Sequence, residues 1–137
     1  MFEFAPIRSE TTGAQTSANT MRGLNVSVCA RAKDLEAEWL ELQKTGWVTP
    51  YQSFDWVNTW QTAVSDLTGE DVRIVTIRDD AGQLHGIFPF VVELAWGTRV
   101  LRWLASSQIN YGMPVMSDAF AGKISEDPQW LFAELLS

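Results

Sequence analysis

The sequence predicts an α/β fold in which a mainly antiparallel sheet is flanked by two or three helices. Two segments, 32–44 and 54–66, carry apolar residues at helical spacing, whereas 72–77, 84–94 and 99–104 are apolar and rich in β-branched residues. Short turns join the three apolar segments, which favours antiparallel neighbours. The chain has 137 residues, of which 46% are hydrophobic, so it can bury the core of one domain.

The first predicted elements are a short strand and a helix. Residues 25–30 (NVSVCA) alternate between polar and apolar side chains, which is typical of a strand. In segment 32–44, the apolar side chains Leu35, Trp39 and Leu42 follow one another at i, i+4 and i+7. This face is therefore expected to pack on the sheet.

The second helix is expected to begin after Ser53, whose hydroxyl can cap it. The stripe that it presents consists of Trp56, Trp60, Ala63 and Leu67. The Trp56–Trp60 pair has two interpretations, a stacking platform for a ligand or part of the core. Aromatic residues at helical spacing more often belong to the core.

The three predicted strands form consecutive hairpins. Asp79–Gly82 supplies turn chemistry between the first two strands, and residues 96–98 (WGT) turn into the third. Pro89 lies inside the second strand and cannot donate a ladder hydrogen bond. At this point the strand is expected to bulge, splay or lie on an edge.

Both ends of the chain differ from its middle. Residues 1–23 are mostly small and polar, which predicts a disordered leader. Residues 24–137 then form the folded part, within which 106–122 are expected to be a long polar loop. Asp127-Pro128 favours a helix start. Because this apolar helix has no cap before Ser137, the folded part is expected to be truncated at its C-terminus.

Composition excludes several classes of protein. A net charge of −7 argues against binding to nucleic acid. Cys29 and His85 are the only residues of their types, which excludes a disulfide framework and a Cys-rich or two-histidine metal site. The longest apolar run is too short for a membrane span. Since no secretory signal opens the chain, a cytoplasmic location is expected.

Candidate reactive residues are few. Histidine side chains in general can exchange protons near neutral pH, so His85 is a possible general base, but no Ser, Cys or carboxylate stands beside it at a recognisable spacing. A hairpin histidine without catalytic role is the favoured interpretation. Cys29 lies in an apolar strand and is expected to be core filler.

Two loop pairs are better candidates for contacts with a substrate. Tyr51-Gln52 and Asn110-Tyr111 each place aromatic and polar groups beside the predicted sheet, where binding sites tend to lie. The alternative is that these hydroxyls and amides only fasten the loop backbone. The hypothesis at this stage is that Tyr51, Gln52, Asn110 and Tyr111 contact a substrate.

Three groups of residues together resemble the start of the CelD/BcsL-type acetyltransferases of the GNAT superfamily, which are linked by name to bacterial cellulose biosynthesis. The resemblance covers residues 24–136 and rests on short motifs: Thr49-Pro50-Tyr51-Gln52 followed by Trp56 and Trp60, the hairpin segment Gly82–Phe90, and Asn110-Tyr111-Gly112-Met113-Pro114. The third motif departs from the family pattern, which has Asp at the position of Asn110 and lacks the extra glycine.

The resemblance implies a GNAT-like half-domain from an enzyme that transfers an acetyl or other acyl group from CoA to an amine or hydroxyl. Family members look like two such halves in tandem, with acetyl-CoA expected mainly in the second half. The matching motifs are not catalytic ones, so no catalytic residue is carried over. Segment 83–88 half-matches a pyrophosphate-binding loop, but Phe88 stands where that loop needs a small residue.

Three expectations about activity and partners follow. This part of the enzyme is expected to be inactive alone and to hold neither cofactor nor metal. Its partner is expected to be the missing C-terminal half, or a second copy bound through the last helix. The alternative function is a non-catalytic interaction or ligand-binding module.

Overall fold

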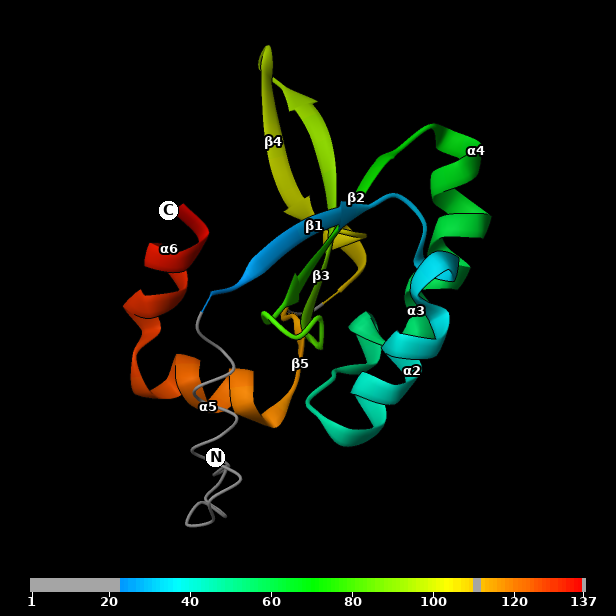
Figure 1. The fold of residues 1–137 in the computed structure, drawn as a ribbon. Helices are drawn as coiled ribbons and strands as arrows, with labels where there is room; N and C mark the ends of the chain where they lie inside the picture. Colours follow the sequence, from blue (N-terminus) through cyan, green and yellow to red (C-terminus); the bar gives the residue numbers. More distant parts are fainter. Residues whose placement is uncertain (1–22, 110–111, 137) are drawn as a thin grey trace.

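A computed structural model describes residues 23–109 and 112–136 of the chain. The predicted leader, apart from Gly23, lies outside the described residues. The fold is α/β, as predicted, and is built on an antiparallel sheet (Figure 1). In chain order the strands are β1 (Asn25–Cys29), β2 (Asp71–Arg78), β3 (Leu84–Ala95), β4 (Thr98–Trp103) and β5 (Val115–Met116).

The helices fall into two groups along the chain. The first group comprises the 3₁₀ turn η2 (Ala32–Leu35), α2 (Glu36–Thr45), the 3₁₀ turn η3 (Pro50–Gln52), α3 (Phe54–Trp60), the π-helical turn η4 (Gln61–Ser65) and α4 (Asp66–Thr68). The second comprises the 3₁₀ turn η5 (Ser106–Gln108), α5 (Asp118–Glu126) and α6 (Pro128–Leu136). Strands pair in the order β1-β2-β3-β4, and β5 pairs with β3.

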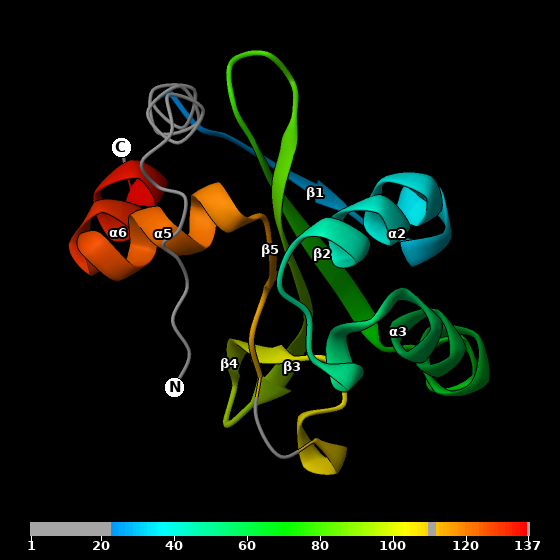
Figure 2. The same ribbon diagram turned by 90° about the horizontal axis from the view of Figure 1, so that it is seen from below.

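Helices α2 and α3 lie on one face of the sheet, and α5 and α6 lie on the other (Figure 2). On one face, strand residues such as Ile74 and Ile87 form a buried cluster with Trp39 and Leu42 of α2 and Val57 of α3. The indole N–H of Trp39 donates to the carbonyl oxygen of Gln52 at 3.1 Å, which satisfies its one polar atom inside this core.

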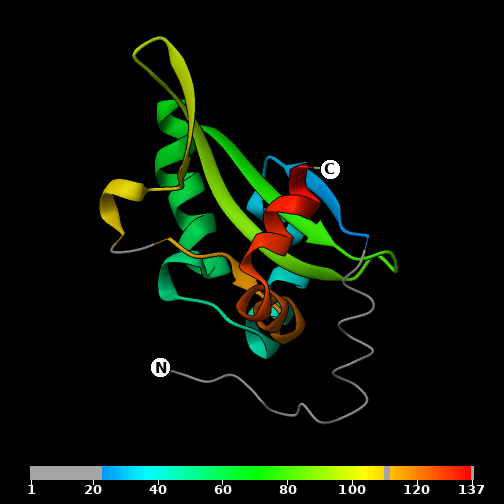
Figure 3. The same ribbon diagram turned by 90° about the vertical axis from the view of Figure 1, so that its left-hand side faces the viewer.

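A smaller cluster forms on the other face. Ile77 and Phe120 are fully buried there, and Phe88, Trp130 and Leu131 pack against them. The Phe120 ring of α5 meets the Trp130 ring of α6 edge to face, with centroids 6.0 Å apart. The sheet is therefore the middle of three layers, seen from a third side in Figure 3.

Pro89 lies where β3 changes its neighbour. Ile87 pairs with Val115 of β5, whereas Phe90 pairs with Trp103 of β4. The Pro89 carbonyl accepts a hydrogen bond from the Leu104 N–H at 3.0 Å. Because the N and O of one strand residue point to the same side, the missing N–H of Pro89 faces the place where β4 and β5 part. Of the alternatives predicted for this strand, the structure thus has a splay.

The predicted stripe on the second helix is partly wrong. Trp56 and Trp60 pack against the core, but Ala63 is exposed and Leu67 is 81% exposed. The reason is η4, whose wider turn holds an extra residue and shifts the helix face by about one position. Gln61 and Ser65 are buried instead.

The predicted long loop is also partly wrong. Residues 115–116 form β5, and α5 begins at Asp118 with Ser117 as its cap: the Ser117 hydroxyl oxygen accepts from the Phe120 N–H at 3.1 Å. The polar residues and Gly122 concealed this short helix in the sequence pattern. The last helix begins at Pro128, as predicted.

We expect the large core to dominate the stability of this domain. Replacing the fully buried Ile74 by alanine (Ile74→Ala) should lower the free energy of unfolding by about 3 kcal/mol, because it leaves a cavity between the sheet and α2. The matched change Leu67→Ala, at an exposed helical site, should alter it by less than about 0.5 kcal/mol. Urea unfolding followed by circular dichroism measures both, and equal losses would contradict the assigned core.

Candidate functional site

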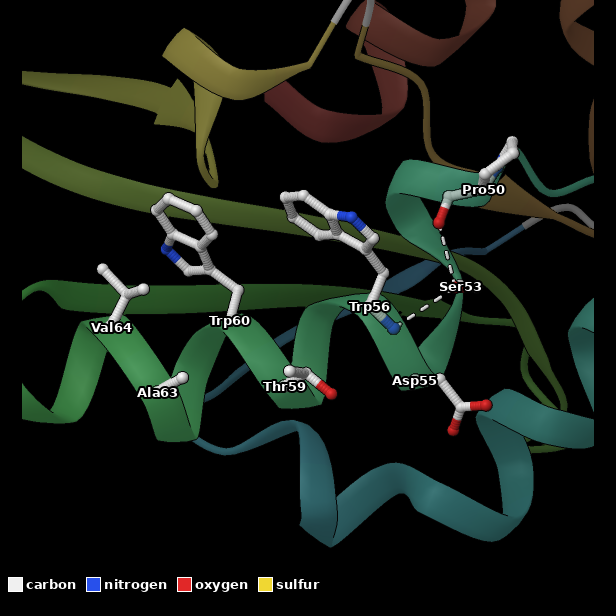
Figure 4. Close-up of a pocket in the computed structure, with 8 residues that line it drawn as sticks. All are labelled: Pro50, Ser53, Asp55, Trp56, Thr59, Trp60, Ala63 and Val64. Atoms are coloured by element: carbon white, nitrogen blue, oxygen red, sulfur yellow. Dashed lines mark hydrogen bonds between the residues drawn. The ribbon is translucent and has the colours of Figure 1, made fainter.

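An open groove of about 600 Å³ runs along the outer side of α3 and η4. We call it the Trp groove. Its lining is mostly apolar, and Figure 4 shows the residues that form it: Pro50, Ser53, Asp55, Trp56, Thr59, Trp60, Ala63 and Val64. Since they belong to one turn and one continuous helical run, the groove is largely a helix surface with two indoles beside it.

The two indoles of the Trp groove are parallel. The rings of Trp56 and Trp60 lie within 7° of parallel with centroids 5.6 Å apart, and both project from the same side of α3 (Figure 4). The Tyr51 ring meets Trp56 edge to face, with centroids 5.9 Å apart. Aromatic pairs in these geometries attract one another, so three rings support each other around the groove.

Polar contacts fix both ends of this aromatic row. At the start of α3, the Ser53 hydroxyl oxygen accepts from the backbone N–H of Trp56 at 3.3 Å and caps the helix. At the other end, the Trp60 indole N–H donates to the Glu70 carboxylate at 3.1 Å, and the Ser65 hydroxyl donates to the same oxygen at 2.5 Å. The backbone that carries Trp56 and the indole plane of Trp60 are thereby held before any ligand arrives.

The π-helical turn η4 is anchored by a buried amide. The Gln61 side chain accepts from the Ala32 N–H at 2.9 Å and donates to the Ala30 carbonyl at 2.6 Å. These two bonds satisfy backbone groups between β1 and η2, and they stabilise a wide helical turn beside Trp60. Such π-helical turns are frequent at functional sites.

The groove combines apolar ring surface with a few polar groups at its rim. Thr59 and Asp55 are exposed, and Figure 4 shows the Asp55 carboxylate pointing away from the indoles, at the end of the groove near α2. This arrangement can stack a ring or an alkyl chain and hydrogen-bond a hydroxyl or amine at its edge.

The structure describes two of the four residues that the sequence proposed as substrate contacts. Tyr51 lies against the Trp groove through its contact with Trp56. Gln52 is buried, and its side-chain oxygen accepts a hydrogen bond from the Thr49 hydroxyl. Asn110 and Tyr111 lie outside the described residues. Of the four, Tyr51 is therefore placed beside a candidate site, and Gln52 is placed where it fastens the loop.

The sequence pattern did not indicate a second polar arrangement. His85 is 4% exposed and bridges two side chains: its Nε2 lies 2.8 Å from Asp79 Oδ2 and its Nδ1 lies 2.8 Å from the Ser117 hydroxyl oxygen. Asp79 is 2% exposed, and its other oxygen accepts from the N–H groups of Ala81 and Gln83. We call this Asp79–His85–Ser117 set the buried polar chain.

The donors in the buried polar chain follow from its acceptors. An ionised Asp79 can only accept, so His85 donates to it from Nε2. In the neutral form of the ring, Nδ1 then accepts from the Ser117 hydroxyl. The Ser117 oxygen also caps α5. The imidazole is buried and the serine caps a helix, so the buried polar chain links the hairpin turn and β3 to α5. It resembles a catalytic triad in composition, but its contacts are those of a structural tie.

The sequence offered little signal for this tie. Asp79 precedes His85 by six positions and Ser117 follows it by 32, so no spacing rule joins them. Asp79 was identified only as a turn residue, which it also is. The tie arises because β5 pairs with β3 and delivers the start of α5 to His85.

The structure also places the half-matched loop and Cys29. Segment 83–88 lies mostly within β3, so the amides of the half-matched loop belong to a strand and form no loop before a helix. Cys29 is half-buried, and its thiol lies 3.2 Å from the Arg31 carbonyl oxygen. Within 23–109 and 112–136, no three His, Cys, Asp or Glu side chains gather as metal ligands would.

The helices in the described part of the chain are all too short or too polar to cross a membrane. No model of a known protein family matches this chain, and neither a curated protein nor a solved structure does.

We expect Asp79 to contribute more to the stability of the domain than an ordinary turn residue would. The change Asp79→Asn would place an amide N–H₂ or a weaker acceptor against His85 and should cost about 2 kcal/mol of unfolding free energy at pH 7. The neighbouring exposed change Asp80→Asn is the control and should cost less than about 0.5 kcal/mol. Urea unfolding would contradict the tie if the two variants were equally stable.

The Asp79 carboxyl should also make the free energy of unfolding depend on pH in the acidic range. Burial raises the pKa of Asp79, but the hydrogen bonds from His85, Gln83 and Ala81 outweigh it and leave the pKa below the ordinary value of 3.8. A carboxyl with a lowered folded-state pKa stabilises the fold above its unfolded pKa, and this stabilisation is lost as the pH falls through the folded value. The stability difference between the wild type and Asp79→Asn should therefore shrink below about pH 4. A difference that stays constant from pH 7 to 3 would contradict this assignment.

Proposed function

We propose that this chain is the acceptor-binding part of a GNAT-type acyltransferase of the CelD/BcsL kind. The reaction would move an acetyl or other acyl group from CoA to an amine or hydroxyl. The observation that supports this proposal most is the Trp groove, which begins at the Thr49–Ser53 turn of the family-like motif and includes both of its tryptophans. The α/β fold with a mainly antiparallel sheet is compatible with such a half-domain.

The groove suits the acceptor side of such a reaction. Acyl transfer needs the acceptor held in one orientation, so that its nitrogen or oxygen attacks the thioester carbonyl carbon. A C–N or C–O bond forms, the C–S bond breaks, CoA leaves as the thiol, and the acceptor loses one proton. Preset indoles can hold the body of the acceptor by stacking, while rim groups such as Thr59 orient its polar end.

Acetyl-CoA is assigned to another part of the enzyme. Its pyrophosphate calls for bare backbone amides at a helix start. Segment 83–88 supplies strand amides instead, and at α5 the Ser117 side chain already accepts the Phe120 N–H. The proposal therefore places the CoA ester on a second half that packs against this one, and predicts that this chain alone transfers no acyl group.

A second candidate function is binding without chemistry. The Trp groove is open to solvent and would serve a ligand-binding module equally well. The two functions differ in one measurable respect: an acceptor-binding half supports release of CoA thiol once its other half is supplied, whereas a binding module does not.

Ligand binding in the Trp groove should change the fluorescence of its tryptophans. We expect intrinsic tryptophan fluorescence to change when tyramine, glucosamine or cellobiose binds, and to stay unchanged with acetyl-CoA alone. The change Trp60→Leu should weaken the binding of the best of these probes about tenfold, because a stacking surface is lost. Calorimetry with the same probe measures affinity independently of the fluorophore removed.

The matched control is Trp96→Leu, at a fully exposed hairpin position remote from the groove. It should leave the affinity unchanged. Micromolar binding of acetyl-CoA to this chain, or failure of every amine and hydroxyl probe to bind, would contradict the acceptor assignment. Release of CoA thiol after the second half is added, measured with a thiol reagent, would then separate transferase from binding module.

A further inference from the structure

Within residues 23–109 and 112–136, the strand β1 forms one edge of the sheet. It pairs with β2 from Asn25 opposite Arg78 to Cys29 opposite Ile74, and among the described residues no strand pairs with its other side. Its first four residues are all exposed, including Val26 at 48% and Val28 at 58%. Both valines stand opposite apolar residues of β2, on the sheet face that carries α5 and α6.

This edge lacks the devices that normally protect an edge strand. Natural edges carry charged side chains, a proline, a bulge or a cover, because their unpaired backbone groups otherwise recruit another strand. The sequence of β1 is NVSVC, with neither charge nor proline, and its register with β2 is regular. The opposite edge differs, since β4 carries Arg99 and Arg102.

We propose that β1 pairs antiparallel with β1 of a second copy of this chain. A two-fold axis at Ser27 places Ser27 opposite its own equivalent. Val26 then lies opposite Val28 of the partner subunit, and Asn25 lies opposite Cys29 of the partner subunit. The two sheets become one continuous sheet, in which exposed valines cover each other and open backbone groups pair.

A second copy is the occupant that the sequence of β1 favours. The net charge of −7 makes two copies repel one another, and pairing through the uncharged β1 is a contact that places no like charges directly together. The pattern of β1 around Ser27 is the same in both directions: a valine on each side, then a small polar or thiol residue.

The size of the contact sets the strength of the dimer. A five-residue strand is about 17 Å long, so this pairing alone buries less than the roughly 1,200 Å² of a standard stable interface. A reversible dimer with a dissociation constant in the micromolar range is therefore expected. This dimer would form whether or not the proposed function holds. Its interface differs from the one that the sequence predicts, which is the last helix.

A charge-swap pair tests the contact. In one variant both valines become lysine (V26K/V28K), and in the other both become glutamate (V26E/V28E). In the proposed register each variant places like charges opposite each other in its own dimer, whereas a mixture places Lys opposite Glu. Sedimentation equilibrium between 1 and 200 µM compares the average masses with the 15.4 kDa of one chain.

We expect the wild type to approach twice the monomer mass with rising concentration, each variant alone to remain a monomer, and the equimolar mixture to recover the dimer. Thermal unfolding by circular dichroism checks that both variants fold. The control L94K/L101K changes exposed residues of the other hairpin and should leave the dimer intact. A monomeric wild type at 200 µM, dimers that survive in both variants, or a dimer lost only in L94K/L101K would overturn the proposal.

Discussion

The change of neighbour along β3 is the constraint on which the rest of the fold depends. One strand has to pair with β5 near its start and with β4 near its end, on the same side. Pro89 suits this position because it has no N–H that would need an acceptor between the two neighbours. Beyond it, β5 pairs with Gly86 and brings the start of α5 to the sheet. The second helical layer, and with it the buried polar chain, depends on this change of neighbour.

The groove illustrates how buried polar residues shape an exposed surface. Gln61 and Ser65 occupy positions where a regular amphipathic helix would bury apolar side chains. Their hydrogen bonds hold the π-helical turn against the loop after β1 and fasten Glu70 to Trp60. The half-buried indoles therefore stand on a framework whose polar groups are already paired. A ligand that binds there loses less free energy in ordering the side chains.

Most of the sheet could be predicted from the sequence, because its strands are local, apolar and joined by tight turns. The helix containing Trp39 was equally clear. Prediction failed where side chains override periodicity: the π-helical turn moved Leu67 to the surface, and a serine cap created α5 within an apparent loop. The candidate site was predictable in part: Tyr51 was a predicted contact, whereas the periodicity favoured the core for Trp56 and Trp60, which do pack against it. The partners of His85 were not, because they meet only in the folded chain.

The buried polar chain also bears on the order in which the domain assembles. The β2–β3 hairpin closes over a few residues, so its contacts cost little chain entropy, whereas the bond from Ser117 to His85 closes a separation of 32 residues. The lower entropy cost therefore favours hairpin pairing before the docking of α5 and α6. In a chain that has not completed this docking, Ile77 and Phe88 would be exposed. Such exposed apolar side chains favour aggregation over folding.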